Sequence, residues 1–251
     1  MDSPISMHIS SLPRLPLFFS MFLSIYLFAY FVVFRNWSSN LRPEASSCAI
    51  SLFHGTPAVF LATAALITDP NRGFASVNTA GQNLVLDYGI AYFLMDLFHF
   101  LLFNPRDFLF IGHHSATLFV FVTCRYVVSH GAYAVLVLLA LAEATSFCQN
   151  TWTLAGARRA DSEIADKVFG LLSPPFYAFY SVARGLAGPV FMYEMVMFYL
   201  SGAADGVIPR WAWVSWIVVV LMAISVSIIW VSSLWVKLYR ERVGKTDKKI
   251  R

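Results

Sequence analysis

Charged residues are scarce in this sequence of 251 residues. Asp, Glu, Lys and Arg make up 13% of it, whereas soluble globular domains carry about 25%. So few charges cannot cover the surface of a water-soluble protein, because exposed apolar patches lead to association. Cysteine is scarce as well: Cys48, Cys124 and Cys148 are odd in number and lie in or beside apolar runs, which argues against a disulfide framework. A soluble enzyme and a secreted disulfide-rich module are both disfavoured.

Apolar residues are abundant instead. They make up 58% of the chain, aromatic residues make up 16%, and the mean hydropathy is +0.65. This much apolar surface can offset the chain entropy lost on folding, so intrinsic disorder is excluded. The net charge of +4 is concentrated in the C-terminal segment 237–251, which holds seven basic and two acidic residues. A basic tail on an almost neutral chain argues against a nucleic-acid partner and favours a position beside an anionic membrane surface.

The apolar residues form runs that are long enough to cross a membrane, which takes about 20 residues in a helix. We expect seven spans, at residues 15–34, 50–67, 84–103, 108–128, 132–154, 170–200 and 211–236. The first run has no signal-peptide cleavage site, so we expect it to be retained. In the sixth run, Pro174, Pro175, Gly185, Gly188 and Pro189 predict a kinked or interrupted helix. The predicted fold class is an all-α polytopic membrane protein with a single membrane domain.

Basic residues predict the orientation of this membrane domain, because Lys and Arg are enriched on the cytosolic side. A cytosolic C-terminus, with the N-terminus luminal, places thirteen of them on the cytosolic side and four on the other. The sequence ends in Lys248-Lys249-Ile250-Arg251. This end resembles the dilysine signal by which coat proteins return membrane proteins to the endoplasmic reticulum, although a solvated basic tail is the simpler reading. We expect a multi-pass protein of the endoplasmic reticulum membrane.

Ionisable and amide side chains occur within five of the predicted spans. Each charged side chain costs about 2.5–3.5 kcal/mol at the centre of a bilayer, so it normally faces a partner or a cavity. Most of these groups fall in the cytosolic half of the membrane, which indicates a shared polar site there. Its candidate residues are His54, Asp96, His99, His113, His114, Glu143, Asn150 and Arg184.

Helical spacing groups these residues further. Asp96 and His99 are three residues apart, so they share a helix face and can form a hydrogen bond. Glu143, Ser146 and Asn150 also form one stripe. By contrast, His113 and His114 diverge by about 100° around the helix axis. We expect one of this pair to enter a cavity and the other to pack against a neighbouring helix.

Two alternatives compete with a functional cavity. Polar side chains often form hydrogen bonds between membrane helices, and each such bond stabilises the bundle by roughly 0.6 kcal/mol. This structural role would explain a single histidine such as His54. Asp87, near the luminal boundary, is expected to be interfacial. A metal could be bound by His54, His99 and one of the His pair, but no His spacing supports it. We therefore expect neither a metal nor a cofactor. P-loop, G-x-S-x-G and G-x-G-x-x-G motifs are absent from the sequence.

An ordered set of these residues carries a family resemblance. The set comprises His54, Asp96-Leu-Phe-His99, Asn104-Pro-Arg-Asp107, His113-His114, Ala142-Glu-Ala-Thr-Ser146, Asn150 and Arg184-Gly-Leu-Ala-Gly-Pro189. It resembles the TLC-domain family of ceramide synthases and translocating-chain-associating membrane proteins, and most closely the small TLC-domain proteins. The resemblance implies six helices around a membrane-embedded cavity and one additional N-terminal helix. The implied divisions are 1–44 (luminal N-terminus, first span and cytosolic loop), 45–240 (TLC domain) and 241–251 (basic cytosolic tail).

The resemblance also implies lipid chemistry. The His pair of ceramide synthases belongs to an acyl-transfer site, which implies catalytic roles for His113 and His114 and acyl-CoA as the co-substrate. Asp96 or Glu143 would orient an imidazole, and His54, His99, Asn150 and Arg184 would contact the substrate. The ceramide synthases carry an H-D-x-x-D element where this chain has Ala142-Glu-Ala-Thr-Ser146. That departure argues against acylation of a sphingoid base.

Three functions remain open from the sequence. The first is an acyl-CoA-dependent lipid acyltransferase that acts in membrane lipid homeostasis. The second is a non-catalytic protein that binds, senses or traffics membrane lipids through the same cavity. The third is an assembly factor for other membrane proteins. The polar cluster favours the first two, because assembling membrane proteins does not require buried histidines.

Overall fold

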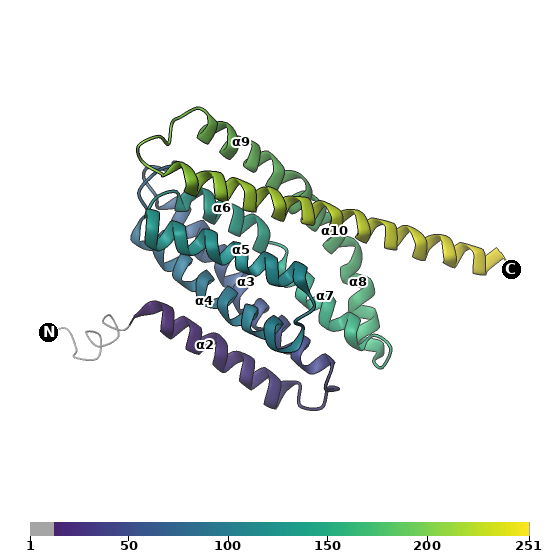
Figure 1. Ribbon diagram of the computed structural model, residues 1–251. Coiled ribbons are helices and arrows are strands. Elements are labelled where there is room, and N and C mark those ends of the chain that lie inside the picture. Colours follow the sequence, from purple (N-terminus) through teal and green to yellow (C-terminus); the bar gives the residue numbers. More distant parts are fainter. Residues whose placement is uncertain (1–12, 251) are drawn as a thin grey trace.

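The computed structural model describes the backbone of residues 13–250 and side chains up to Arg240. The proposed dilysine signal, Lys248-Lys249-Ile250-Arg251, therefore lies outside the described side chains. The described chain is a bundle of helices (Figure 1). Three of its helices contain π-helical turns, labelled η. In chain order the elements are α2 (Arg14–Phe28), η1 (Ala29–Val33), α3 (Leu41–Ile67), α4 (Ala80–Phe103), α5 (Phe108–Val122), η2 (Thr123–Val128), α6 (Ala132–Glu143), α7 (Ser146–Arg158), α8 (Glu163–Tyr180), η3 (Ser181–Ala187), α9 (Gly188–Leu200) and α10 (Arg210–Ile250).

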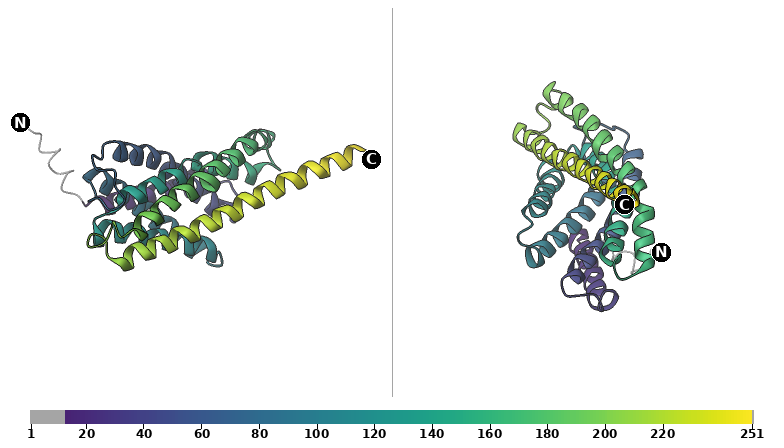
Figure 2. Two further views of the ribbon diagram at one scale, coloured as in Figure 1. Left: turned by 90° about the horizontal axis from the view of Figure 1, so that it is seen from above. Right: turned by 90° about the vertical axis from the view of Figure 1, so that its right-hand side faces the viewer.

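Six stretches of helix within the described residues are long and apolar enough to cross a membrane. They are Arg14–Val33, Leu41–Ile67, Ala80–Phe103, Phe108–Val128, Ala132–Arg158 and Arg210–Arg240. An all-α polytopic fold is thereby confirmed. The second predicted span begins earlier than expected, because Pro43 lies in the first turn of α3 and permits a helical start there. The last span continues as α10 past the ends of the other helices (Figures 1 and 2).

The sixth predicted span, 170–200, differs from the others. It lies within a helical stretch that begins at Glu163 and is interrupted by the π-helical turns η3 before it continues as α9. This stretch is not among the six helices above. The predicted interruption is confirmed. A π-helical turn replaces the regular hydrogen bonds over one turn, and such turns are frequent at functional sites.

Helix α4 is the central helix of the bundle. In its most apolar stretch 67% of the residues are buried, compared with 6% for α10. The helix begins with a capping box, in which Thr79 accepts from the backbone N–H of Gln82 and the side chain of Gln82 accepts from Thr79 N–H. Its neighbours are α2, α3, α5 and α6. Polar side chains on α4 can therefore reach four other helices.

A partly buried ion pair joins α4 to η2 near the start of α4. Arg125 donates from Nε to Oδ1 of Asp87 over 2.9 Å and from Nη2 to Oδ2 over 3.3 Å. The hydroxyl of Tyr126 donates to the same carboxylate over 2.7 Å. Asp87 is 2% exposed, so its carboxylate is buried within the protein, while its expected depth near the luminal boundary stays a prediction. The pair was missed because its partners are separated by 38 residues and lie on different helices.

Close packing of α4 against α5 depends on Gly89. A Cβ atom at this position would lie 2.7 Å from Cε2 of Phe121, whereas a Cβ at Gly112 on α5 would meet nothing within 4 Å. We expect Gly89→Ala to lower the unfolding temperature, because overpacking costs about 1–3 kcal/mol and exceeds the helix-propensity gain of about 1 kcal/mol. Gly112→Ala, the control, should leave it unchanged or raise it. Thermal unfolding in detergent measures both, and equal shifts would contradict this packing.

Candidate functional site

A buried carboxylate on α4 joins three helices. Oδ2 of Asp96 lies 2.9 Å from Nε2 of His114 on α5. Oδ1 accepts a hydrogen bond of 2.6 Å from the hydroxyl of Ser47 on α3. All three side chains are buried. In hydrocarbon a carboxylate has no water to solvate it, so these two contacts supply its partners from within the protein.

The expected pairing of Asp96 with His99 is wrong. His99 Nδ1 instead lies 2.9 Å from the hydroxyl of Tyr26 on α2. The two residues share a face of α4 as predicted, but each turns toward a different neighbouring helix. Helix α2 thus takes part in the buried polar network through Tyr26.

Both ring nitrogens of His114 face acceptor atoms. Nδ1 lies 2.9 Å from the carbonyl oxygen of Phe110, and Nε2 faces Asp96. Two acceptors require two protons on the ring, or one proton on the ring and one on the carboxyl group. In either case His114 has no nitrogen left for a ligand. Its role is to hold Asp96 and to join α5 to α4.

His113 has a different environment from its neighbour, as the divergence of the two side chains predicts. The side chain of His113 lines a cavity, and His113 is an exposed residue. Among the described residues, no hydrogen bond is made by its ring nitrogens. The ring meets that of His114 edge to face, with centroids 5.5 Å apart. His113 is therefore the member of the pair that can contact a ligand.

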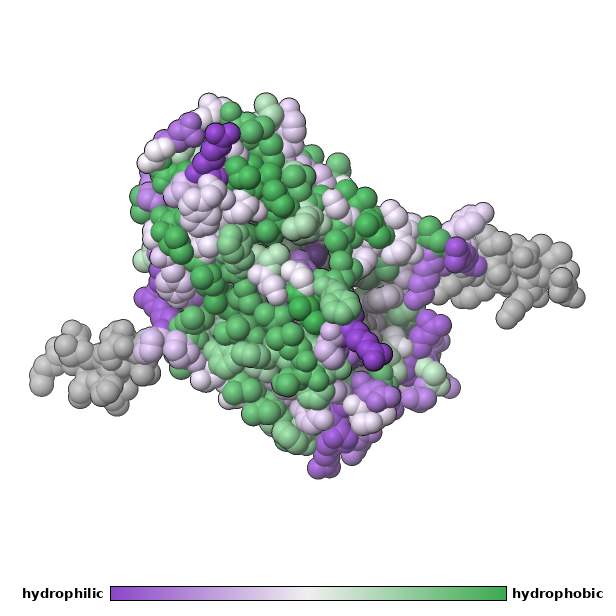
Figure 3. Space-filling model, in the orientation of Figure 1, coloured by the Kyte–Doolittle hydropathy of each residue, from purple (hydrophilic) through white to green (hydrophobic). Residues whose placement is uncertain are grey.

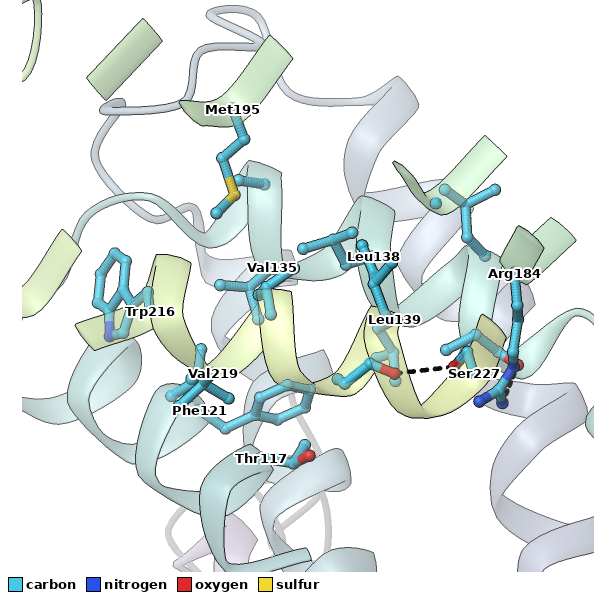
Figure 4. A pocket seen from close by; sticks show the side chains of 18 of the residues that line it. Thr117, Phe121, Val135, Leu138, Leu139, Arg184, Met195, Trp216, Val219 and Ser227 are labelled. Atoms are coloured by element: carbon cyan, nitrogen blue, oxygen red, sulfur yellow. Dashed lines mark hydrogen bonds between the residues drawn. The ribbon is translucent and has the colours of Figure 1, made fainter. Parts of the chain in front are cut away.

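The cavity lies between α4, α5, α6, η3, α9 and α10 and has a volume of about 160 Å³. Its wall is mostly apolar and includes Phe121, Val135, Leu138, Leu139, Met195, Trp216 and Val219. Figure 4 shows Trp216 and Met195 at one end and Arg184 and Ser227 at the other. Polar groups are gathered in the lining near His113, Glu143 and Arg184. The cavity is thus an apolar chamber with a polar end.

A smaller recess of about 20 Å³ adjoins the polar end. It shares His113, Arg184, Ala223 and Ser227 with the main cavity and is otherwise lined by residues of α5 and α10. Both helices lie on the face that Figure 1 presents. On that face, Figure 3 shows a hollow with a hydrophilic group at its floor, surrounded by apolar surface. This side of the bundle would face lipid.

Glu143 connects the cavity with the buried polar network. Helix α6 ends at this residue, and α7 starts at Ser146 after a two-residue turn. A Cβ on Gly55 of α3 would lie 2.6 Å from Cβ of Ser146 and 2.7 Å from Oε2 of Glu143, so the glycine permits the close approach of α3 to this turn. The same oxygen lies 3.8 Å from Nδ1 of His54. One carboxyl oxygen therefore points toward α3.

His54 is fully buried, with 0% exposure. Its ring is stacked on Tyr92 with centroids 3.8 Å apart and an interplanar angle of 8°. Neither ring nitrogen has a hydrogen-bond partner among the described residues. A hydrogen bond between helices therefore does not explain the presence of His54 at this position.

The predicted stripe of Glu143, Ser146 and Asn150 is kept across the turn between α6 and α7, because Glu143 and Ser146 both face Gly55 of α3. Asn150 donates from Nδ2 to the carbonyl oxygen and to the hydroxyl of Ser146, over 2.9 and 3.1 Å. It does not line the cavity. Its expected contact with a substrate is therefore not supported by its position, and its role is local to α7.

The predicted site residues thus fall into two groups. The residues that line the cavity are His113, Glu143 and Arg184. Those that form the buried network behind it are His54, Asp96, His99 and His114. Among the described residues, no three His, Cys, Asp or Glu side chains gather as metal ligands.

Sequence reasoning missed several members of the buried network: Tyr26, Ser47, Ser51, Tyr88 and Tyr92. A signal for four of them was present. Tyr88, Tyr92 and Asp96 are spaced by four residues, which places them on one face of α4. Ser47 and Ser51 show the same spacing on α3, and the hydroxyl of Ser51 lies 2.8 Å from that of Tyr92.

The contact between Asp96 and His114 can be measured with a double-mutant cycle. We expect Asp96→Ala and His114→Ala each to lower the free energy of unfolding by about 3–5 kcal/mol, because each leaves a buried polar partner unpaired. The double variant should be scarcely less stable than either single one. Ser47→Ala, as a milder reference, should cost about 1 kcal/mol. Unfolding in detergent provides the data, and strictly additive losses would show that the two residues do not interact.

Comparisons with known proteins give a consistent result. The family model described as TLC domain matches residues 44–236. A TLC domain-containing protein of Arabidopsis thaliana is 63% identical over 246 residues, which are 96% of this chain and 97% of that protein. No solved structure matches the chain. Helix α2, with Tyr26, precedes the matched region.

Proposed function

Because the chain belongs to the TLC-domain family, we propose that it binds the acyl chain of a membrane lipid in its cavity and acts in membrane lipid homeostasis. The observation that carries this proposal is the cavity itself, whose apolar wall ends in a polar group of His113, Glu143 and Arg184. Small-molecule sites commonly combine an apolar wall with a few polar groups that fix the orientation of the ligand.

The apolar part of the cavity suits a hydrocarbon chain. Aliphatic and aromatic side chains from α5, α6 and α10 form its wall, and a cavity lined in this way favours an apolar ligand over water. At the far end, Trp216 donates its indole N–H to Thr123 over 2.8 Å. The polar atom of the tryptophan is therefore already occupied. Only apolar surface of its ring remains for the end of a chain.

Filling the cavity tests this proposal. We expect Ala223→Phe, which places a ring in the cavity wall of α10, to reduce binding of a labelled fatty acid at least about tenfold, a loss of some 1.4 kcal/mol. Ser225→Phe is the matched control, because Ser225 lies on the same helix and is exposed. Saturation binding to protein in nanodiscs measures both variants. Equal affinities for the two would place the bound chain outside the cavity.

Acyl transfer is a second candidate function. It is favoured by His113, which lines the polar end of the cavity and whose ring nitrogens make no hydrogen bond among the described residues. A neutral imidazole can accept the proton of a hydroxyl or amine as that group attacks the carbonyl carbon of an acyl-CoA. The carbon–sulfur bond then breaks, and the CoA thiolate takes the proton from the imidazolium. Acyl-CoA is the co-substrate in this proposal.

A transfer assay distinguishes catalysis from binding. If His113 is the base, wild-type protein should move labelled acyl groups from acyl-CoA to a mixed pool of lipid acceptors. His113→Ala should then lower the rate by about 100-fold or more. His130→Ala, a histidine outside the site, should keep it. If folded protein transfers no label, at any acyl-chain length and to any acceptor, acyl transfer is contradicted. Lipid binding without catalysis is then the remaining function.

We also propose the endoplasmic reticulum membrane as the location, with the C-terminus in the cytosol. The support is the excess of basic residues on that side and the family resemblance. Coat proteins that read Lys248 and Lys249 are the partners this location suggests.

A further inference from the structure

The polar end of the cavity contains an arginine that no carboxylate of the described residues contacts directly. Among the described residues, no carboxylate lies within 4.0 Å of the guanidinium nitrogens of Arg184. Arg125, the arginine of the Asp87 pair, differs because it has a carboxylate partner at 2.9 Å. An isolated charge in a membrane is costly and normally faces a partner. Glu143 interacts with Arg184 electrostatically but lies beyond this distance, so Arg184 forms no ion pair in direct contact.

The guanidinium of Arg184 is held in place by neutral groups only. Nη2 donates to the carbonyl oxygen of Ala142 over 2.6 Å, and the guanidinium lies over the ring of Tyr180 at 5.1 Å. Nε is buried and has no hydrogen-bond partner among the described residues. The charge is therefore fixed in position, and at least one buried donor remains available. A guanidinium with free donors is suited to carboxylate and phosphate oxygens.

Arg184 also lies at the correct place for the head group of a lipid. It lines both the main cavity and the smaller recess, and Figure 4 shows it at the end opposite Trp216. A chain that extends from Arg184 toward Trp216 would have its head group at the junction of the two cavities. The recess lies between α5 and α10, on the side that would face lipid.

We propose that the cavity binds a single-chain lipid with an anionic head group, a carboxylate or a phosphate monoester, and that Arg184 provides the counter-charge. The inference rests on the proposed lipid-binding function and adds the chemical class of the ligand. An anion would supply a counter-ion in direct contact with Arg184 and an acceptor for Nε. Charge-assisted hydrogen bonds of this kind are roughly twice as strong as neutral ones.

Glu143 lines the same end of the cavity and would oppose an anion if its charge faced the ligand. Its Oε2 points away toward α3, however, and lies 3.8 Å from Nδ1 of His54. If Glu143 instead recognised the ligand, the preferred head group would be an ammonium. The experiment therefore includes a cationic lipid.

Four probes that share one hexadecyl-length chain separate these cases: palmitate, palmitoyl lysophosphatidate, hexadecanol and hexadecylamine. Each competes with labelled palmitate for the full-length protein in nanodiscs. We expect one of the two anionic probes to bind at least about tenfold more tightly than hexadecanol. Whichever anion binds more tightly identifies the head group as carboxylate or phosphate.

Variants assign this preference to Arg184. Arg184→Gln should remove the preference and leave the affinity for hexadecanol unchanged, which also shows that the variant is folded. Arg184→Lys should keep part of the preference. Arg159→Gln, which removes an equal charge outside the cavity, should behave as wild type. Glu143→Gln should leave the preference intact or increase it.

Three outcomes would overturn the inference. Equal affinities for all four probes would support binding of the chain but no recognition of an anion. Tightest binding of hexadecylamine, lost in Glu143→Gln, would assign the head-group site to the carboxylate instead. If none of the four probes binds saturably, both the proposed lipid-binding function and the inference are contradicted.

Discussion

A carboxylate within hydrocarbon must find its partners inside the protein, and Asp96 finds them on α3 and α5. Ser47 and His114 hold its two oxygens, and His114 is held in turn by the carbonyl of Phe110. These contacts fix the rotation of α5 against the central helix α4. With His114 turned inward, His113 must point elsewhere, because adjacent side chains diverge by about 100°. The buried pair therefore determines which histidine lines the cavity.

The cavity adjoins this network at Phe93 of α4, which lines the cavity and lies against the ring of His114. Its wall comes from α5, α6 and α10, while η3 brings Arg184 to its polar end. The two regions meet at Glu143, which lines the cavity and turns one oxygen toward His54. Helix α10 is the least buried of the spans and forms part of the cavity wall.

Most of the fold could be predicted from the sequence, because apolar runs of sufficient length have few alternatives to a membrane helix. The interruption near Gly185 and the divergence of His113 from His114 were also predictable, since each depends only on local geometry. The partners that these side chains find on other helices were not predictable. Asp96 pairs with His114 and His99 with Tyr26, although Asp96 and His99 share a face. Arg125 meets Asp87 across 38 residues. Such pairs depend on how each helix is rotated in the bundle, and spacing along a single helix carries no information on that.

The most direct test of the account is to locate a bound chain within the protein. A palmitate that carries a photoactivatable group in its chain, added to the protein in nanodiscs and irradiated, should attach to peptides of α6 and α10. Leu139 and Val219 are the expected contacts, and excess unlabelled palmitate should suppress the attachment. Attachment only to lipid-exposed residues such as Phe31 and Val32 of η1, undiminished by competitor, would contradict a lipid-binding cavity.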